Sequence, residues 1–524
     1  MSARKRTERH AGIAGWIDDS IRTAPDRIAI GTADGRMRAS YRQLNELVAA
    51  LARKLADARI AGTGPIALYS DNSPEFVVAL LAAWRAGAAV VPVNPQLTAT
   101  EVETRLAAVK ARAVVLPRRL ADRYPADVRA PRAWLAEIDT ADNGVALASI
   151  NDGPGQYGPA AQARTGRPPG EADLALLMFT TGSTGTPKIV PLTHGNLGAS
   201  VAGIVSTYHL GPDDATLLIM PLFHGHGLVA GLLATLASAG AAYLPITGRF
   251  SAHLFWTEIA SAHATWYTAV PTVHQILLAR ADTEYPADRP PALRFIRSSS
   301  APLAPAVLTR TQERFGAPVI PAYGMTETAH QAASNPLPGD GICKAASVGM
   351  ATGLDIRIAA ARGTPAAAGE TGEVCVRGPA LTSGYLGDPQ ATAEAFSGGW
   401  FRTGDLGHVD SDGYLFLSGR TKDMINRGGE KIAPQSVEAA LLSHPAVEDA
   451  LAFPASDAKY GEEVNAAVIL QPGHRATQAE LQQHCRGLLS AFEIPAKIYF
   501  LDRLPRTAKG DGDRRALAVS LSGD

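Results

Sequence analysis

The chain has 524 residues, of which 46% are hydrophobic and 19% are charged, so we expect a globular protein with two or more domains. Because 49 Lys and Arg residues stand against 50 Asp and Glu residues, the formal net charge is -1, and neither nucleic acid nor an anionic membrane is an expected partner. The three cysteines have neither the spacing of a metal site nor the even count of a disulfide framework, which favours a reducing, cytoplasmic location.

Up to about residue 420, amphipathic helical patterns alternate with short apolar runs. Residues 41–58 have the spacing of an amphipathic helix, and the apolar runs 174–179 and 216–220 are typical of strands buried on both faces. The Ala/Gly-rich stretch 228–244 is shorter than the ~20 residues of a membrane span and is interpreted as buried helix or strand. This alternation predicts an α/β fold, with parallel or mixed sheets covered by helices.

A different pattern begins near Gly419. A glycine-rich turn leads into a helical pattern over residues 435–443, an apolar strand pattern and a second helical pattern over residues 478–490. This order predicts a small α+β unit of about 100 residues, which is an ordinary domain size. We therefore expect an N-terminal domain over residues 1–420 and a C-terminal domain over residues 421–524.

The segment FTTGSTGTPK follows the run 174–179 and is rich in glycine and hydroxyl side chains. Backbone N–H groups and hydroxyls in such a loop wrap phosphate oxygens, and a lysine adds the opposite charge. Its spacing differs from the common P-loop motif, and a polar surface turn is the alternative interpretation. The predicted phosphate-binding residues are Thr180, Thr181, Gly182, Ser183, Thr184, Gly185 and Lys188.

Two later segments complete a nucleotide-binding set. In AYGMTET, Tyr323 offers a ring for a purine, and Glu327 offers a carboxylate for a metal ion or a phosphate-linked role. In GWFRTGDLG, Asp405 lies in a glycine-flanked turn, where a carboxylate accepts hydrogen bonds from both hydroxyls of a ribose. Each residue alone also fits a core aromatic or a loop acid, but together the segments indicate nucleotide binding.

These segments stand in an order that resembles the acyl- and aryl-CoA synthetases of the adenylate-forming superfamily. An ordered series of motifs is far more specific than a single motif. The resemblance covers almost the whole chain, through NSPEF, VPVNP, TTGSTGTPK, PLFHGHG, AVPT, SSSAPL, YGMTET, GEVCVRG, FRTGD, GRTKDMINRGGEKI and LPRTA.

The resemblance implies that the chain binds ATP, an acyl-adenylate or AMP, and coenzyme A. In the family, the phosphate loop and Thr326 hold ATP, and Glu327 holds Mg²⁺. The matching Tyr323 stacks on adenine, whereas Asp405 and Arg420 bind the ribose. The further residues carried over to nucleotide binding are Ser300, Ala301, Pro302, Ala322, Gly324 and Met325.

The resemblance also implies that the small C-terminal domain is mobile and swings about a hinge at Lys422. In one pose the domain completes adenylation. In the other pose Gly428 and Gly429 line a tunnel for the pantetheine of coenzyme A, where a side chain would block the thiol. His224, in PLFHGHG, matches a position that gates the path between coenzyme A and the acyl-adenylate, and a purely structural histidine is the alternative.

The C-terminal motif departs from the family pattern. Family members carry LPRTATGKIQRR, whose lysine reaches the reacting carboxylate and the α-phosphate during adenylation, whereas this chain reads LPRTAKGDGDRR and places Asp511 there. Loss of one preorganised donor typically costs about 100- to 1,000-fold in rate, and a carboxylate adds repulsion. Lys509 lies two residues earlier, within about 7 Å along the chain, and a shift of its glycine-containing loop would supply a cation.

The sequence therefore predicts a CoA ligase that forms a thioester from an acyl-adenylate and coenzyme A, with a separate adenylating enzyme as partner. The alternatives are a complete ATP-dependent acid–CoA ligase that uses Lys509, and a non-catalytic paralogue that binds nucleotide or acyl-adenylate. The resemblance implies a monomer or a dimer. The segments expected around the acyl group contain no lysine or arginine that clearly pairs a second carboxylate; they are residues 223–227, Thr272, residues 298–302 and residues 328–331.

Overall fold

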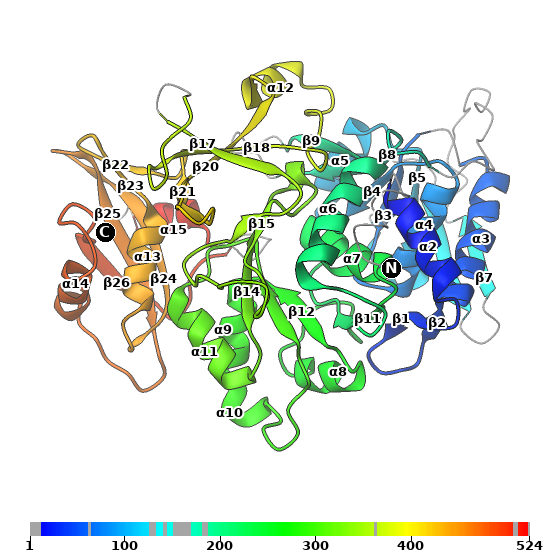
Figure 1. Cartoon of the computed structure of the whole chain (residues 1–524), viewed down its shortest axis with the longest axis horizontal. Helices are drawn as coiled ribbons and strands as arrows, with labels where there is room; N and C mark the ends of the chain where they lie inside the picture. Colours follow the sequence, from blue (N-terminus) through cyan, green and yellow to red (C-terminus); the bar gives the residue numbers. More distant parts are fainter. Residues whose placement is uncertain are drawn as a thin grey trace.

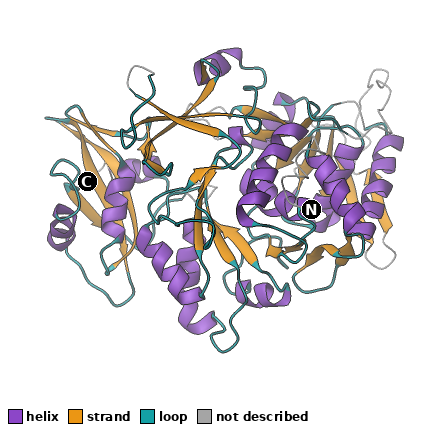
Figure 2. Cartoon of the chain, in the orientation of Figure 1, coloured by secondary structure: helices purple, strands orange, loops and turns teal. Residues whose placement is uncertain are grey.

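The computed structural model describes residues 12–60, 64–124, 133–139, 144–149, 169–180, 187–360, 364–506 and 512–521. Within this part of the chain there are four β-sheets, and helices pack beside them (Figures 1 and 2). Three sheets are built from residues up to Arg420, and the fourth is built from residues after it. The unit that contains the fourth sheet lies at one end of the molecule (Figure 1).

The first sheet is largely parallel, with antiparallel strands at its edges. Its order is β16 (Met350–Ala351), β15 (Ala333–Ser334), β14 (Val319–Tyr323), β13 (Phe295–Ser298), β12 (Trp266–Ala269), β10 (Ala215–Leu217), β11 (Ala241–Leu244), β1 (Ile28–Thr32) and β2 (Arg38–Ser40). Because β13 and β14 are parallel neighbours, the segments after Ser298 and Tyr323 leave the same edge of the sheet, where ligands of α/β proteins bind.

The second sheet is also mixed, with antiparallel pairs at its two ends. Its order is β7 (Gly144–Ser149), β6 (Ala133–Asp139), β5 (Ala113–Pro117), β3 (Ile66–Tyr69), β4 (Val90–Val93), β8 (Leu174–Phe179) and β9 (Ile189–Thr193). The antiparallel pair β8 and β9 brackets the predicted phosphate loop.

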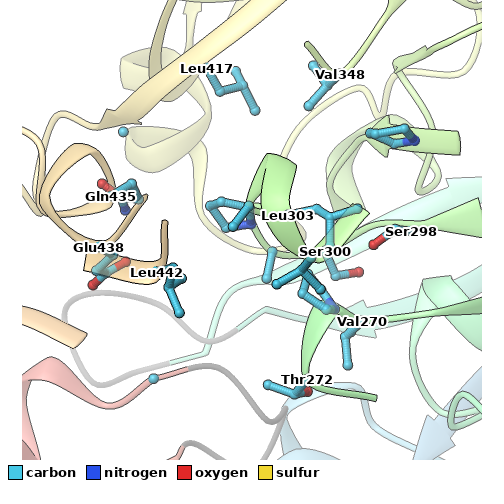
Figure 3. Close-up of a pocket in the computed structure, with 18 of the residues that line it drawn as sticks. Val270, Thr272, Ser298, Ser300, Leu303, Val348, Leu417, Gln435, Glu438 and Leu442 are labelled. Atoms are coloured by element: carbon cyan, nitrogen blue, oxygen red, sulfur yellow. The ribbon is translucent and has the colours of Figure 1, made fainter. Parts of the chain in front are cut away.

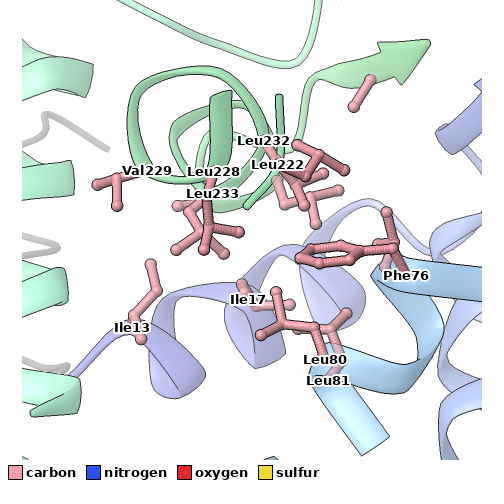
Figure 4. Packing of buried hydrophobic residues seen from close by; sticks show 14 of the residues in the cluster. Ile13, Ile17, Phe76, Leu80, Leu81, Leu222, Leu228, Val229, Leu232 and Leu233 are labelled. Atoms are coloured by element: carbon pink, nitrogen blue, oxygen red, sulfur yellow. The ribbon is translucent and has the colours of Figure 1, made fainter. Parts of the chain in front are cut away.

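Helices of the N-terminal part pack on these sheets around several apolar cores. Side chains from α2, α4 and η2, among them Ile17, Phe76 and Leu228, meet in one of these cores (Figure 4). The helices are α2 (Ile13–Thr23), α3 (Tyr41–Asp57), α4 (Pro74–Arg85), α5 (Ala99–Ala108), η1 (Arg118–Arg123), α6 (His194–Tyr208), the π-helix η2 (His226–Leu233), α7 (Ala234–Ala237), α8 (Phe255–Ser261), α9 (Pro271–Ala279), α10 (Ala281–Glu284), α11 (Pro305–Phe315), η3 (Thr326–Thr328) and α12 (Pro389–Ala395).

The third sheet is antiparallel and follows the first two in the chain. Its strands are β17 (Asp355–Ala359), β18 (Gly372–Arg377), β19 (Phe396–Ser397), β20 (Trp400–Val409) and β21 (Leu415–Arg420). In the register of β20 and β21, Asp405 stands opposite Arg420. Two predicted ribose-binding residues are therefore cross-strand neighbours, at a distance that permits direct pairing.

The C-terminal unit has its own sheet and its own apolar core. The sheet order is β23 (Glu430–Ile432), β22 (Ile425–Arg427), β25 (Gly461–Leu470) and β24 (Val447–Asp457), with β26 (Lys497–Phe500) also paired to β25. Its helices are α13 (Pro434–Leu442), α14 (Gln478–Arg486) and α15 (Arg514–Leu521).

The predicted α/β fold, with mixed sheets covered by helices and a small α+β C-terminal unit, is confirmed. The run 174–179 is a strand as predicted, but the strand predicted over residues 216–220 ends at Leu217. The proposed boundary after residue 420 falls between β21 and β22. In the described ranges, no helix is both long and apolar enough to cross a membrane.

Candidate active site

A cavity of about 420 Å³ lies between the N-terminal part and the C-terminal unit. Gln435, Glu438 and Leu442 of α13 face Ser300 and Leu303 across it (Figure 3). Met325 and Thr326 are half-buried and do not line it. The predicted nucleotide-binding residues in its wall are Ser300, Ala301, Pro302, Ala322, Tyr323, Gly324, Asp405 and Arg420.

Asp405 is fixed between an aromatic hydroxyl and a guanidinium. The carboxylate is buried, with 4% of the residue exposed. The hydroxyl of Tyr323 donates to one of its oxygens at 2.5 Å, and Nε of Arg420 donates to the other at 2.8 Å. Burial and the adjacent carboxylate raise the pKa of Tyr323, so its hydroxyl stays protonated and donates. The wall of the cavity thus presents an oriented carboxylate, which is the acceptor that a ribose diol needs.

We expect Asp405→Asn to weaken AMP binding about 10- to 100-fold, the usual loss for a hydrogen bond to a charged group. Isothermal titration calorimetry with AMP and with 2′,3′-dideoxy-AMP checks this. Wild-type chain should prefer AMP by a similar factor, and the variant should bind the two nucleotides equally. A variant that still prefers AMP would show that the ribose hydroxyls are bound elsewhere.

The described ends of the predicted phosphate loop lie close to Glu327. The N–H of Thr180 donates to the carbonyl of Lys188 at 3.0 Å, and Nζ of Lys188 lies 4.5 Å from the centroid of the Tyr385 ring. The hydroxyl of Tyr385 donates to Oε1 of Glu327 at 2.9 Å. Burial raises the pKa of Tyr385, and the neighbouring Glu327 carboxylate raises it further. Tyr385, which no sequence motif singles out, therefore joins the loop lysine to the predicted metal-binding glutamate.

The central residues of that loop fall outside the described residues; they are Thr181, Gly182, Ser183, Thr184 and Gly185.

Glu327 is the residue that would hold a metal ion. Within the described ranges, no group of three or more His, Cys, Asp or Glu side chains is arranged to hold one. Mg²⁺ is usually held by one or two carboxylates together with substrate phosphates and water. A single buried carboxylate beside the predicted phosphate loop therefore fits Mg²⁺ that arrives with a nucleotide, where the ion would neutralise phosphate charge.

The residues predicted for the coenzyme A step lie apart from the cavity. Lys422, Gly428 and Gly429 are exposed and do not line it. Gly428 and Gly429 have φ values of +60° and +101°, which glycine adopts without strain. Their turn is tied to the sheet by the N–H of Gly428, which donates to the carbonyl of Tyr460 at 2.8 Å.

The segment that replaces the family lysine faces the cavity at both of its described ends. Arg506 and Gly512 both line the cavity and form an isolated β-bridge. Lys509 and Asp511, which lie between them in sequence, fall outside the described residues. The structure therefore has Arg506 and Gly512 at the predicted nucleotide site, whereas the Gly428–Gly429 turn is exposed and lies outside that cavity.

His224, the predicted gate, is half-buried just before the π-helix η2. Its ring lies edge-on to Phe223, with centroids 4.8 Å apart, and its backbone N–H donates to the carbonyl of Pro221 at 3.1 Å. It does not line the cavity between the two units, and its role as a gate stays a prediction.

A buried arginine reaches the segments expected around the acyl group. These segments contain no arginine of their own, but Arg297 of β13 immediately precedes residues 298–302 and is fully buried. Its guanidinium contacts Gln331 and His226, which belong to two other such segments.

Two units that meet at one nucleotide-sized cavity, with strand ends of a mixed α/β sheet in its wall, are the architecture of adenylate-forming enzymes. The AMP-binding enzyme family matches residues 17–386, and the AMP-binding enzyme C-terminal domain matches residues 436–511. The chain therefore belongs to the AMP-binding enzyme family.

Relatives in that family place it among the acid–CoA ligases. It is 42% identical to a probable CoA ligase, CCL9, of Humulus lupulus, over 97% of this chain and 96% of that protein. It is 41% identical to an oxalate–CoA ligase of Arabidopsis thaliana, over 97% of this chain and 98% of that protein. The solved structure of ATP-bound MatB from Rhodopseudomonas palustris superposes with a TM-score of 0.84 at 28% identity, covering 98% of this chain and 99% of that one.

Proposed function

We propose that the chain catalyses the second half-reaction of acid–CoA ligation. The sulfur of coenzyme A attacks the acyl carbon of an acyl-adenylate, the bond from that carbon to the phosphate oxygen breaks, and the thioester and AMP are released with the thiol proton passing to solvent. The observation that carries the proposal is a contrast. The Tyr323–Asp405–Arg420 set is complete, whereas Asp511 occupies the position of the family lysine.

The described arginines on either side of residue 511 in the sequence, Arg506 and Arg514, already have carboxylate partners. Arg506 contacts the carboxylate of Asp449, and one Nη of Arg514 donates to both oxygens of Glu438 at 2.7 and 2.9 Å. Both acids also line the cavity, so each arginine already neutralises a carboxylate. The negative charge that develops on the α-phosphate during adenylation would then be repelled by Asp511, and neither arginine would be free to stabilise it.

Thioester formation makes different demands on the C-terminal unit. We infer that this unit turns about Lys422 and brings the Gly428–Gly429 turn to the acyl-adenylate. No side chain projects from either glycine, so a pantetheine arm passes them without a clash. The step requires no contact from residue 511, and an acyl-adenylate from a separate adenylating enzyme would supply the activated carbonyl.

Two parallel assays of the purified chain test this function. One contains carboxylic acids with ATP, Mg²⁺ and coenzyme A, and the other contains the matching synthetic acyl-adenylates with coenzyme A. We expect acyl-CoA only from the adenylates. Ordinary turnover from acid and ATP would overturn the proposal, and tight acyl-adenylate binding without thioester would identify a non-catalytic paralogue.

A complete ATP-dependent acid–CoA ligase is the competing function, favoured by the presence of Lys509 two residues before Asp511. In that case Lys509→Ala would abolish acid-dependent pyrophosphate release and leave thioester formation from the adenylate intact. Under the proposed function, the variant and the wild-type chain behave alike in both assays.

A further inference from the structure

Arg297 carries a positive charge into the protein interior. Its side chain has 0% exposure, and its hydrogen-bond partners are neutral. Nη2 donates to Oε1 of Gln331 at 3.0 Å, Nη1 donates to the hydroxyl of Thr268 at 3.1 Å, and Nε donates to the hydroxyl of Tyr208 at 3.1 Å. No carboxylate of the described residues lies within 4.0 Å of it, as an ion pair would require.

A second arginine nearby, Arg294, has the carboxylate partner that a buried cation normally has. Arg294, three residues earlier, pairs with the carboxylate of Asp214 at 2.5 Å and also donates to the carbonyl of Tyr208. Buried charges in proteins are normally paired, because an uncompensated ion loses several kcal/mol of hydration. Arg297, which is more deeply buried than Arg294, therefore lacks an anion that its neighbour has.

Buried polar groups without a partner follow Arg297 in the chain and occur in the ring that stacks on His226. The hydroxyls of Ser298 and Ser299 and Nε2 of His330 are buried without a hydrogen-bond partner in the structure. His226 shares hydrogen bonds with Thr268 at 2.6 Å and with Ser300 at 3.0 Å, and its ring stacks on that of His330 with centroids 4.9 Å apart. Burial lowers the pKa of both histidines, so Arg297 carries the charge of the cluster.

The backbone around the cluster is held in uncommon conformations. Ser300 has a φ of +75° and His330 a φ of +85°, a region that side chains other than glycine rarely enter. His226 begins the π-helix η2, a form found mostly at functional sites. Such strain persists where the surrounding structure enforces it, and it gathers at ligand sites.

Ser300 connects this cluster to the nucleotide cavity, because it contacts His226 and also lines the cavity with Ser298 (Figure 3). We propose that Arg297, with His226, Ser300 and His330, binds an anionic group at the far end of the acyl chain. The substrate class is a short carboxylic acid that bears a second carboxylate or a sulfonate. The inference rests on the proposed function, since it places the acyl part of the adenylate in this cluster.

Calorimetry with two stable acyl-adenylate mimics tests the inference without turnover. Both are acyl-sulfamoyl adenosines; one carries a 3-carboxypropanoyl group and the other carries the neutral 3-carbamoylpropanoyl group. We expect the wild-type chain to bind the carboxylate about 10- to 100-fold more tightly, as hydrogen bonds to a charged group give. Arg297→Gln should lose this preference, Arg297→Lys should keep part of it, and Arg294→Gln should keep all of it.

Several outcomes would overturn the inference. Equal binding of the two mimics by the wild-type chain would do so, whatever the variants show. If the Arg297→Gln variant lost affinity for both mimics by the same factor, the role of Arg297 would be purely structural. If that variant does not fold, Ser300→Ala serves in its place and should lower the preference. The assay contains no coenzyme A, so a chain that makes no thioester still reports its choice of acyl group.

Discussion

An Asp511→Lys variant should release pyrophosphate from ATP in the presence of an acid about 100- to 1,000-fold faster than the wild-type chain. The change replaces an anion by a cation at the position where the family contacts the reacting carboxylate and the α-phosphate. Repulsion is removed and a donor is gained, and both changes act on the charge that develops in the transition state. Acid-dependent exchange of labelled pyrophosphate into ATP, with Mg²⁺ and a panel of short acids, measures it without coenzyme A.

Asp502→Lys is the matched control, since Asp502 is exposed on the same unit and its replacement changes the net charge by the same amount. If the Asp511→Lys variant were no faster than this control, residue 511 would not be the cause of weak adenylation. Thioester formation from a supplied acyl-adenylate should be the same in both variants. That step uses the other pose of the C-terminal unit, so a large change in its rate would also count against the assignment.

Local periodicity was sufficient to predict helices and strands, but it did not predict the irregular form of one helix. The helix predicted over residues 41–58 is present as α3, which a Ser40 and Gln43 capping box starts. The stretch 228–244, expected as buried helix or strand, holds the end of the π-helix η2, then α7 and β11, so the prediction is confirmed, but the pattern did not specify the π form. A β-carbon on Gly227 would lie 2.3 Å from the carbonyl oxygen of Met220, a tertiary approach that no local pattern reports.

Motifs named the residues of the candidate site, but not the contacts between them. Tyr323 and Asp405 were both predicted for nucleotide binding, yet their hydrogen bond joins residues 82 positions apart. Tyr385 was missed because its function depends on a neighbour, Glu327, from a distant segment. Arg297 did leave a signal, since a charged residue directly follows the apolar pair Phe295 and Ile296 in LRFIRS. Recognising it as unpaired required knowing every side chain around a buried strand.

The thioester step should depend on the turn at Gly429. Gly429→Leu is expected to slow acyl-CoA formation from a supplied acyl-adenylate by about 100-fold or more, the scale of loss when a reacting group is displaced by about 1 Å. AMP affinity should not change, because Gly429 is exposed and lies outside the nucleotide cavity. Single-turnover formation of acyl-CoA, together with calorimetry for AMP, separates these two effects.

Gly473→Leu controls for the strain of the substitution. Gly473 and Gly429 have φ values of +78° and +101°, and a β-carbon on either would meet no atom within 4 Å. Each variant therefore pays about 1–2 kcal/mol for a left-handed backbone, and both should unfold at similar temperatures. A Gly429→Leu variant as fast as Gly473→Leu would contradict the tunnel. A slow one, with AMP binding intact, would mean that an exposed turn reaches the acyl-adenylate only after the C-terminal unit has moved.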